Sequence, residues 1–285
     1  MTGPTGKTPA ADPTFAGRYG PWAVVTGASD GIGRALALAL ASRGLNLILV
    51  ARRADRLEAV AEIVRTYGVA ALVIPADLAR PTAWDIVLDA AAAHDVGLLV
   101  AAAGFGTSGP LLEGYAVTDL VMVSVNCTAV RAQPPACEER FTARGRGGIV
   151  LMGSLLGFQG VPGAAAYAAT KAFVQTLAEG LRPELRRAGV DVLAVAPGPV
   201  RSGFADRAGL RMGLALPAAA VAGPILSALG RRTTVRPGWL SWLLEAAFIG
   251  QPRSLRSRIL ARVMAGMIPP RGRDHPAATT PGGGL

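Results

Sequence analysis

Between residues 21 and 199, short apolar runs alternate with longer segments that mix apolar and polar positions. The expected strands are 23–25, 45–50, 71–74, 98–101, 149–152 and 190–195. These runs are continuously apolar, which is typical of parallel strands buried on both faces. Because they alternate with helical segments, we expect an α/β fold: a doubly wound parallel sheet in a three-layer αβα arrangement.

Prolines occur within two of the helical segments. Pro134-Pro135 lie within 118–144, where we expect them to kink or break the helix because proline cannot donate a backbone hydrogen bond. Pro183 lies within the helix expected over 165–188 and does not fit that pattern. After residue 200, the expected elements are a mobile substrate lid over 201–216, a helix over 217–229 and a last strand over 232–236.

The chain is expected to divide where its composition changes. Residues 1–20 read as a flexible N-terminal leader, 21–238 as the α/β domain, 239–270 as a helical C-terminal extension, and 271–285 as a disordered tail rich in proline and glycine. The leader has no apolar stretch like that of a secretory signal peptide, so we expect a cytoplasmic protein. Residues 212–230 carry no charge, but their prolines and glycines argue against a membrane-spanning helix.

The chain is strongly basic, with a net charge of +10. Its arginines gather late in the sequence and aromatic residues are only 5%, so stacking side chains do not accompany the charge and we expect no nucleic-acid partner. An anionic cofactor or an anionic membrane surface explains the charge better.

A glycine-rich turn follows the first expected strand, reading Thr26-Gly27-Ala28-Ser29-Asp30-Gly31-Ile32-Gly33. An Ala- and Leu-rich helix over 34–43 comes next. Glycines allow the backbone to approach a ligand closely, and the helix N-terminus offers free N–H groups to a phosphate. The spacing, T-G-x-x-x-G-x-G, is a variant of the common dinucleotide-binding turn.

Ala51-Arg52-Arg53 follow the second expected strand, at a point where many dinucleotide-binding folds carry an acid for the ribose hydroxyls. Two guanidinium groups can instead bind the 2′-phosphate of NADP, so we expect NADP(H) to be preferred over NAD(H). The alternative is that both arginines are solvated surface residues. Asp77, Gly104, Ser154 and Pro197-Gly198 also follow expected strands, and so fall at the ligand-binding edge of the sheet.

Tyr167 and Lys171 are four residues apart on an expected helix and so share one face. An ammonium beside the phenol favours the phenolate and lowers the pKa of the tyrosine towards neutrality. Ser154, at the end of a strand, could bring a hydroxyl to the same point. Such a site can polarise a carbonyl and move a proton, which suits hydride transfer with a cofactor and requires no metal. The alternative is a solvated Tyr–Lys pair without a role.

Taken together, these motifs resemble the short-chain dehydrogenase/reductase family over about residues 22–204, which implies a Rossmann-like fold. The resemblance implies that Tyr167 is the general acid and base, that Lys171 lowers its pKa and binds the nicotinamide ribose, that Ser154 holds the substrate oxygen, and that Asn126 supports a proton relay. The cofactor-binding residues that it implies are Gly27, Ser29, Asp30, Gly31, Ile32, Gly33, Arg52, Arg53, Asp77, Leu78, Ala103, Gly104, Tyr167, Lys171, Pro197, Gly198 and Val200.

One departure concerns the fourth strand, which reads Ala101-Ala102-Ala103-Gly104 where the family usually has Asn-Asn-Ala-Gly. Losing both amides removes hydrogen bonds near the cofactor loop, and a buried group left unpaired there costs about 1–3 kcal/mol. We therefore hold two hypotheses. The first is an NADP(H)-dependent oxidoreductase acting on a hydrophobic ketone or secondary alcohol; the second is a binding or regulatory protein with the same fold and impaired catalysis.

The extension at 239–270 mixes tryptophans and leucines with arginines such as Arg256 and Arg262. It reads either as a cap over the substrate pocket or a dimer partner, or as an amphipathic segment in peripheral contact with the inner face of a membrane. The family resemblance also implies a homodimer or homotetramer.

Overall fold

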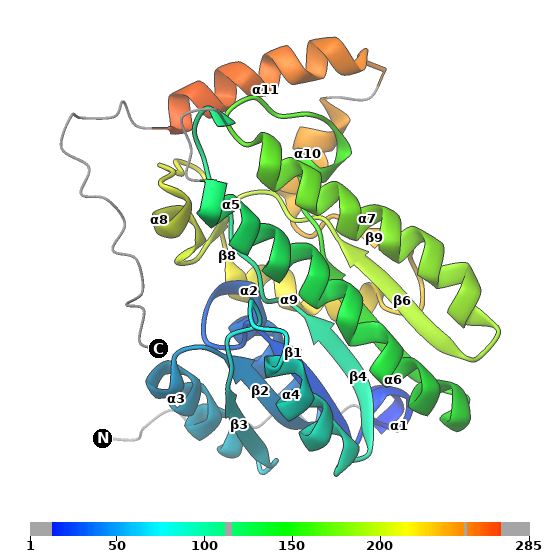
Figure 1. Cartoon of the computed structure of the whole chain (residues 1–285). Helices are drawn as coiled ribbons and strands as arrows, with labels where there is room; N and C mark the ends of the chain where they lie inside the picture. Colours follow the sequence, from blue (N-terminus) through cyan, green and yellow to red (C-terminus); the bar gives the residue numbers. More distant parts are fainter. Residues whose placement is uncertain (1–12, 112–115, 248–249, 269–285) are drawn as a thin grey trace, which may run out of the picture.

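The computed structural model describes residues 13–111, 116–247 and 250–268. Its centre is a parallel seven-stranded sheet with the order β3-β2-β1-β4-β5-β6-β9 (Figure 1). The strands are β1 (Trp22–Thr26), β2 (Asn46–Ala51), β3 (Ala71–Pro75), β4 (Val96–Ala101), β5 (Gly147–Met152), β6 (Val190–Val195) and β9 (Thr234–Val235). All seven expected strands are therefore present. A small parallel pair, β7 (Val200–Arg201) and β8 (Leu216–Pro217), was not expected.

Helices cover both faces of the sheet, which confirms the three-layer fold (Figure 1). One face carries α1 (Pro13–Tyr19), α2 (Gly31–Ala41), α3 (Ala54–Arg65) and α9 (Ala218–Ala228). The other carries α4 (Ala83–Ala92), α6 (Val130–Arg144) and α7 (Ala165–Arg186). Strands β4 and β5 are buried at every position, so their continuous apolar runs face helices on both sides. Each fully buried leucine or valine there contributes roughly 2 kcal/mol.

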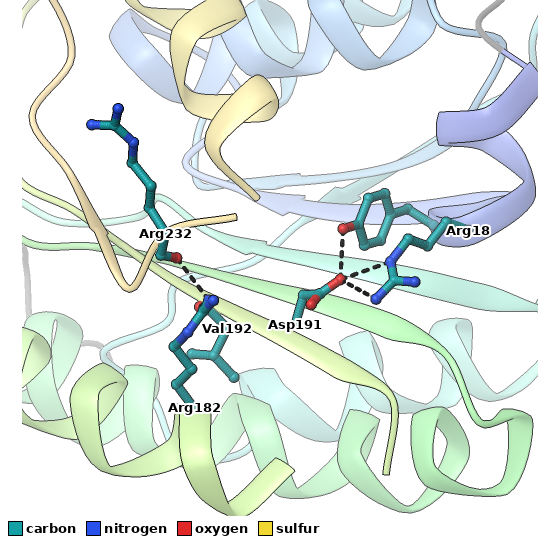
Figure 2. A network of polar contacts seen from close by, with 6 residues as sticks. Arg18, Arg182, Asp191, Val192 and Arg232 are labelled. Carbon is teal, nitrogen blue, oxygen red and sulfur yellow. Dashed lines mark hydrogen bonds and ion pairs between the residues drawn. The ribbon is translucent and has the colours of Figure 1, made fainter. Parts of the chain in front are cut away.

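Helix α1 corrects the expectation of a flexible leader over residues 1–20. Asp191 of β6 accepts hydrogen bonds from Tyr19 Oη at 2.7 Å and from Arg18 Nε at 2.8 Å (Figure 2). Tyr19 is also buried against the sheet. Residues 13–19 are therefore fixed to the domain, because an acid far along the chain supplies the partner for both side chains. Residues 1–12 and the tail at 271–285 lie outside the described residues.

The helix that contains Pro134-Pro135 continues through those prolines, so the predicted break is wrong. The irregularity comes earlier: α5 (Ala116–Val123) passes into a π-helical segment, η2 (Ser124–Ala129), and then into α6. Proline's fixed φ is compatible with a helix, so the element continues although each proline lacks a backbone donor. The C-terminal end of α6 is held by Arg140 and Arg144, which donate to backbone carbonyls of α4 and β4.

Pro183 likewise lies inside α7 without ending it. Its neighbour Arg182 donates from Nη1 to the carbonyls of Val192 and Arg232, at 2.9 and 2.7 Å (Figure 2). These bonds tie the helix to β6 and to the segment before β9, so the last turns of α7 keep their place despite the missing backbone donor.

The C-terminal extension is helical, as expected, and consists of α10 (Trp239–Ala246) and α11 (Arg253–Met267). In the part of the chain that the structure describes, no helix combines the length and the apolar character that crossing a membrane requires.

Candidate active site

A cavity of about 780 Å³ opens at the carboxyl ends of the central strands. Its walls come from the glycine-rich turn, the ends of β2, β4 and β5, the start of α7, the segment after β6, and the two C-terminal helices. Of the residues expected at the site, only Asn126 does not line this cavity. The topology therefore brings together expected site residues that are up to 173 positions apart, from Gly27 to Val200.

The glycine-rich turn has little room for side chains. Gly27 has a φ of +67°, and a Cβ there would lie 2.8 Å from the carbonyl group of Ala102. Asp30 caps α2 by accepting a hydrogen bond from Gly31 N at 2.7 Å. A close-packed backbone turn at a helix N-terminus fits the pyrophosphate of a dinucleotide.

Beyond this turn, Arg52 and Arg53 line the same cavity at the end of β2. A guanidinium nitrogen of Arg53 lies 3.9 Å from a carboxylate oxygen of Asp30. Asp77 also lines the cavity, next to Leu78, and its carboxylate accepts from Ala79 N at 3.2 Å. The side chain of Asp77 thus shapes the turn after β3 while facing the cavity.

Ser154, Tyr167 and Lys171 meet in the cavity wall, and all three are buried. Ser154 caps the short helix η3 (Leu155–Phe158), and its Oγ accepts a hydrogen bond from Leu156 N at 3.2 Å. Lys171 Nζ donates to the carbonyl of Met152 at 2.8 Å and lies 5.7 Å from the centre of the Tyr167 ring. The helix spacing and the end of β5 thus bring the phenol, the hydroxyl and the ammonium together.

The pKa values differ from the sequence-based expectation. Burial raises the pKa of Tyr167 to about 12, and the neighbouring Ser154 side chain offsets only part of that rise. Burial also lowers the pKa of Lys171, to about 8. The expectation that Lys171 lowers the pKa of the phenol is therefore not met, because desolvation dominates both groups and the ammonium is held by a backbone carbonyl.

Asn126 lies behind the cavity wall and is fully buried. Its Nδ2 donates to Phe105 O at 2.8 Å and to Thr170 Oγ1 at 3.1 Å, and its Oδ1 accepts from Phe105 N at 3.1 Å. Both amide hydrogens are thus committed to protein groups. The π-helical segment η2 positions this side chain, as such segments often do at functional sites.

The loop that follows β4 keeps hydrogen-bond partners although alanines stand where the family usually has two asparagines. Ala103 N donates to Thr26 Oγ1 at 3.1 Å, and Ala102 N donates to Val100 O at 3.1 Å. The next residues are held by the two bonds between Asn126 and Phe105. A threonine on β1 and the amide of η2 therefore bond the backbone of this loop.

Sequence reasoning missed Phe204, which lies in the segment expected as a lid. This segment contains a short helix, α8 (Phe204–Ala208), and the Phe204 ring lies 5.3 Å from that of Tyr167. Gly203 N donates to Asp30 Oδ2 at 3.2 Å, so the lid begins directly on the glycine-rich turn. The sequence signal for this contact was the apolar content of the lid segment, which does not identify which residue meets Tyr167.

The C-terminal helices form another part of the cavity wall. Leu260 and Met264 of α11 are buried against Val161, Ala164 and Ala168. This apolar face of α11 therefore packs over the cavity, as the capping interpretation expects.

Helix α10 is bonded to the segment that follows β6. Ser241 Oγ accepts from Gly198 N and donates to Pro237 O, both at 2.8 Å. Near it, Arg236 pairs with Glu245 at 2.8 Å. The Pro197-Gly198 turn thus depends on a residue of the C-terminal extension for its hydrogen bond.

A buried phenol, hydroxyl and ammonium at one point can polarise a carbonyl and transfer a proton, and the adjoining glycine-rich turn can hold the phosphates of a dinucleotide. Fold and site together define a nucleotide-dependent oxidoreductase. The model of the short chain dehydrogenase family matches residues 21–211, and the chain belongs to this family. It is therefore a pyridine nucleotide-dependent oxidoreductase acting on CH–OH or C=O groups.

Individual relatives agree with this assignment. An uncharacterized oxidoreductase of Myxococcus xanthus is 38% identical over 63% of this chain and 72% of the relative. A 7beta-hydroxysteroid dehydrogenase of Clostridium sardiniense is 33% identical over 65% of this chain and 71% of the relative. The structure of a short-chain dehydrogenase from Sphingobium yanoikuyae in complex with NADPH is 33% identical, with a TM-score of 0.74, over 83% of this chain and 95% of that one.

Proposed function

We propose that this protein is an NADP(H)-dependent dehydrogenase or reductase whose substrate is a hydrophobic ketone or secondary alcohol. The observation that carries the proposal is the buried cluster of Ser154, Tyr167 and Lys171 in the wall of a single large cavity. The apolar residues of α11 that line the same cavity favour a hydrophobic substrate. The likeness to a hydroxysteroid dehydrogenase supports a bulky ketone or alcohol.

In this mechanism Tyr167 is the general acid for carbonyl reduction. Its raised pKa keeps the phenol protonated at neutral pH, the state from which it can donate a proton to the carbonyl oxygen. Ser154 holds that oxygen by a hydrogen bond, and Lys171 would bind the nicotinamide ribose of the cofactor. Bound reduced nicotinamide cofactor supplies the hydride to the carbonyl carbon. In the opposite direction the phenolate accepts the alcohol proton.

The preference for NADP(H) rests on Arg52 and Arg53, since two guanidinium groups at the end of β2 can pair with a 2′-phosphate. The likeness to a dehydrogenase solved with NADPH supports it. The first test is a fluorescence titration with NADPH and NADH in parallel. We expect tighter binding of NADPH, and loss of that preference in the Arg52→Ala/Arg53→Ala variant. Equal binding of both nucleotides by the wild type would refute the preference.

The catalytic roles are tested separately with Tyr167→Phe. This change removes the transferable proton but keeps the ring that contacts Phe204. We expect no turnover in a screen of hydrophobic ketones and alcohols, with NADPH binding largely intact. Unchanged turnover would rule out the proposed mechanism.

The alternative is a binding or regulatory protein without catalysis. Ala101-Ala102 and the interior prolines motivated that hypothesis, but Thr26 and Asn126 bond the backbone of the loop after β4. We therefore favour an active enzyme. If the wild type binds NADPH tightly but turns over no ketone or alcohol, the result would favour a binding or regulatory protein.

Exposed apolar side chains support two further proposals about partners. On α10, Trp239 and Trp242 are 58% and 66% exposed, which favours peripheral contact of a cytoplasmic protein with the inner face of a membrane. Co-sedimentation with anionic vesicles should be weaker for Trp239→Ala/Trp242→Ala than for the wild type, and equal behaviour would refute the contact.

On α5, Val117 and Leu120 are 73% and 67% exposed, which favours a homodimer or homotetramer. A monomeric mass in solution would refute that assembly.

A further inference from the structure

The substrate lid carries an arginine that lines the same cavity as Arg52 and Arg53. Arg207 lies on α8, three residues after Phe204, and it lines the cavity together with the two arginines that follow β2. The lid and the cofactor-binding end of the sheet therefore contribute to one cationic cluster. Sequence reasoning gave no role to this residue.

The position of the lid relative to the cluster is fixed by contacts at its base. Gly203 N donates to Asp30 Oδ2 at 3.2 Å, and a Cβ on Gly203 would lie 2.6 Å from the same oxygen. A Cβ on Gly31 would lie 2.8 Å from Ser202 Cβ. The lid thus rests on the glycine-rich turn without space between them, and α8 begins at that point.

The cluster carries more positive than negative charge. The pKa of Arg207 is lowered, first by partial burial and then by the charges of Arg52, Arg53 and Arg56. Among the described residues that act on this pKa, Asp30 is the acid that opposes the effect, and its carboxylate is also next to Arg53. Like charges held together at the rim of a cavity favour an anionic ligand there.

We propose that Arg207 is a third binding residue for the 2′-phosphate of NADP(H), so that the substrate lid itself takes part in selecting the cofactor. The anion is a phosphate monoester on an adenosine ribose, flanked by Arg52 and Arg53 on the β2 side and by Arg207 on the lid side. Because Arg207 and Phe204 share one short helix, binding of the phosphate would stabilise the position of the ring next to Tyr167. The inference rests on the proposed NADP(H) preference.

The test compares Arg207→Gln with Arg211→Gln in binding assays. Arg211 is an exposed arginine of the same segment that does not line the cavity, and serves as a matched control. Affinities are measured calorimetrically for 2′,5′-ADP, 3′,5′-ADP and 5′-AMP, with NADPH and NADH titrations alongside. We expect Arg207→Gln to weaken 2′,5′-ADP and NADPH roughly tenfold, as for one charge-assisted hydrogen bond, and to change 5′-AMP and NADH less than about twofold. Arg211→Gln should leave all of them unchanged.

The outcomes separate the inference from the proposal that it rests on. If the wild type prefers NADPH and Arg207→Gln keeps the full preference, the role of Arg207 is refuted while the NADP(H) proposal stands. If the wild type binds NADPH and NADH equally, both fail. Tighter binding of 3′,5′-ADP than of 2′,5′-ADP by the wild type would also overturn the inference, since the cluster would then suit the 3′-phosphate of a coenzyme A-type substrate.

Discussion

Replacing Asn126 with alanine tests whether this residue acts as a proton relay or as a clamp on the cofactor loop. The change removes three hydrogen bonds, two to the backbone of Phe105 and one to Thr170 Oγ1. Phe105 is half-buried, so water from the cavity can partly replace Asn126 at its N–H and carbonyl, while Thr170 Oγ1 keeps its bond to Tyr167 O. At about 1 kcal/mol for each lost bond, the expected destabilisation is about 3 kcal/mol.

The assay is urea denaturation, followed by NADPH titration and steady-state kinetics. With a urea m-value of about 3 kcal/mol/M for a chain of this size, the midpoint should fall by about 1 M. The affinity for NADPH should fall as well, because Phe105 adjoins the loop at Ala103-Gly104. Gln133→Ala is the matched control: Gln133 is a buried amide on the following helix with a single bond to Ala129 O and no position on the cavity. It should lower the midpoint less and leave NADPH binding unchanged.

The reasoning would be refuted by an Asn126→Ala protein with wild-type denaturation midpoint and NADPH affinity but a much lower kcat. That result would mean that the amide acts only on the reaction, as a relay residue would.

Three further perturbations follow from the site. Burial lowers the pKa of Lys171 from 10.5 to about 8, so the folded state binds fewer protons than the unfolded state between these values, and this group's contribution to stability rises with pH through that window. Wild type should therefore gain about 2 kcal/mol relative to Lys171→Met between pH 7 and 10, measured by urea denaturation, and a constant difference would contradict the pKa. Ser241→Ala leaves Gly198 N without its acceptor and should cost about 1–2 kcal/mol, with an increased KM for the substrate; wild-type values of both would show that the bond has no effect. Gly27→Ala combines a φ of +67° with a Cβ 2.8 Å from the Ala102 carbonyl, so NADPH affinity should fall at least tenfold by titration, and unchanged binding would mean that the turn adapts.

The central sheet could be predicted because each strand is identifiable from its own short segment, a continuous apolar run bounded by turn residues. The cluster of Ser154, Tyr167 and Lys171 was also predictable in place, since helix periodicity and strand ends fix where such residues lie. The pKa values of Tyr167 and Lys171 were not predictable, because desolvation depends on how completely the surrounding chain buries each group.

Other features escaped prediction because they depend on partners far away in the sequence. Helix α1 is held by a bond between Tyr19 and Asp191, which are 172 residues apart. The lid is placed by a bond between Gly203 and Asp30, which are 173 residues apart. The amphipathic pattern of 239–270 was visible, but whether its apolar face meets a cavity or a membrane depends on the shape of the rest of the domain.

The bond between Ser241 and Gly198 has a consequence for exchanging substrate specificity between members of the family. Residues 239–270 look like an independent module that could be replaced at a junction after Gly238. Their first helix, however, supplies the acceptor for a backbone donor in the turn after β6. A chimaera joined at Gly238 would therefore import a foreign partner for that turn, whereas a junction in the short connection between α10 and α11 would keep the native one. The segment to exchange between family members is therefore α11 together with the connection that precedes it.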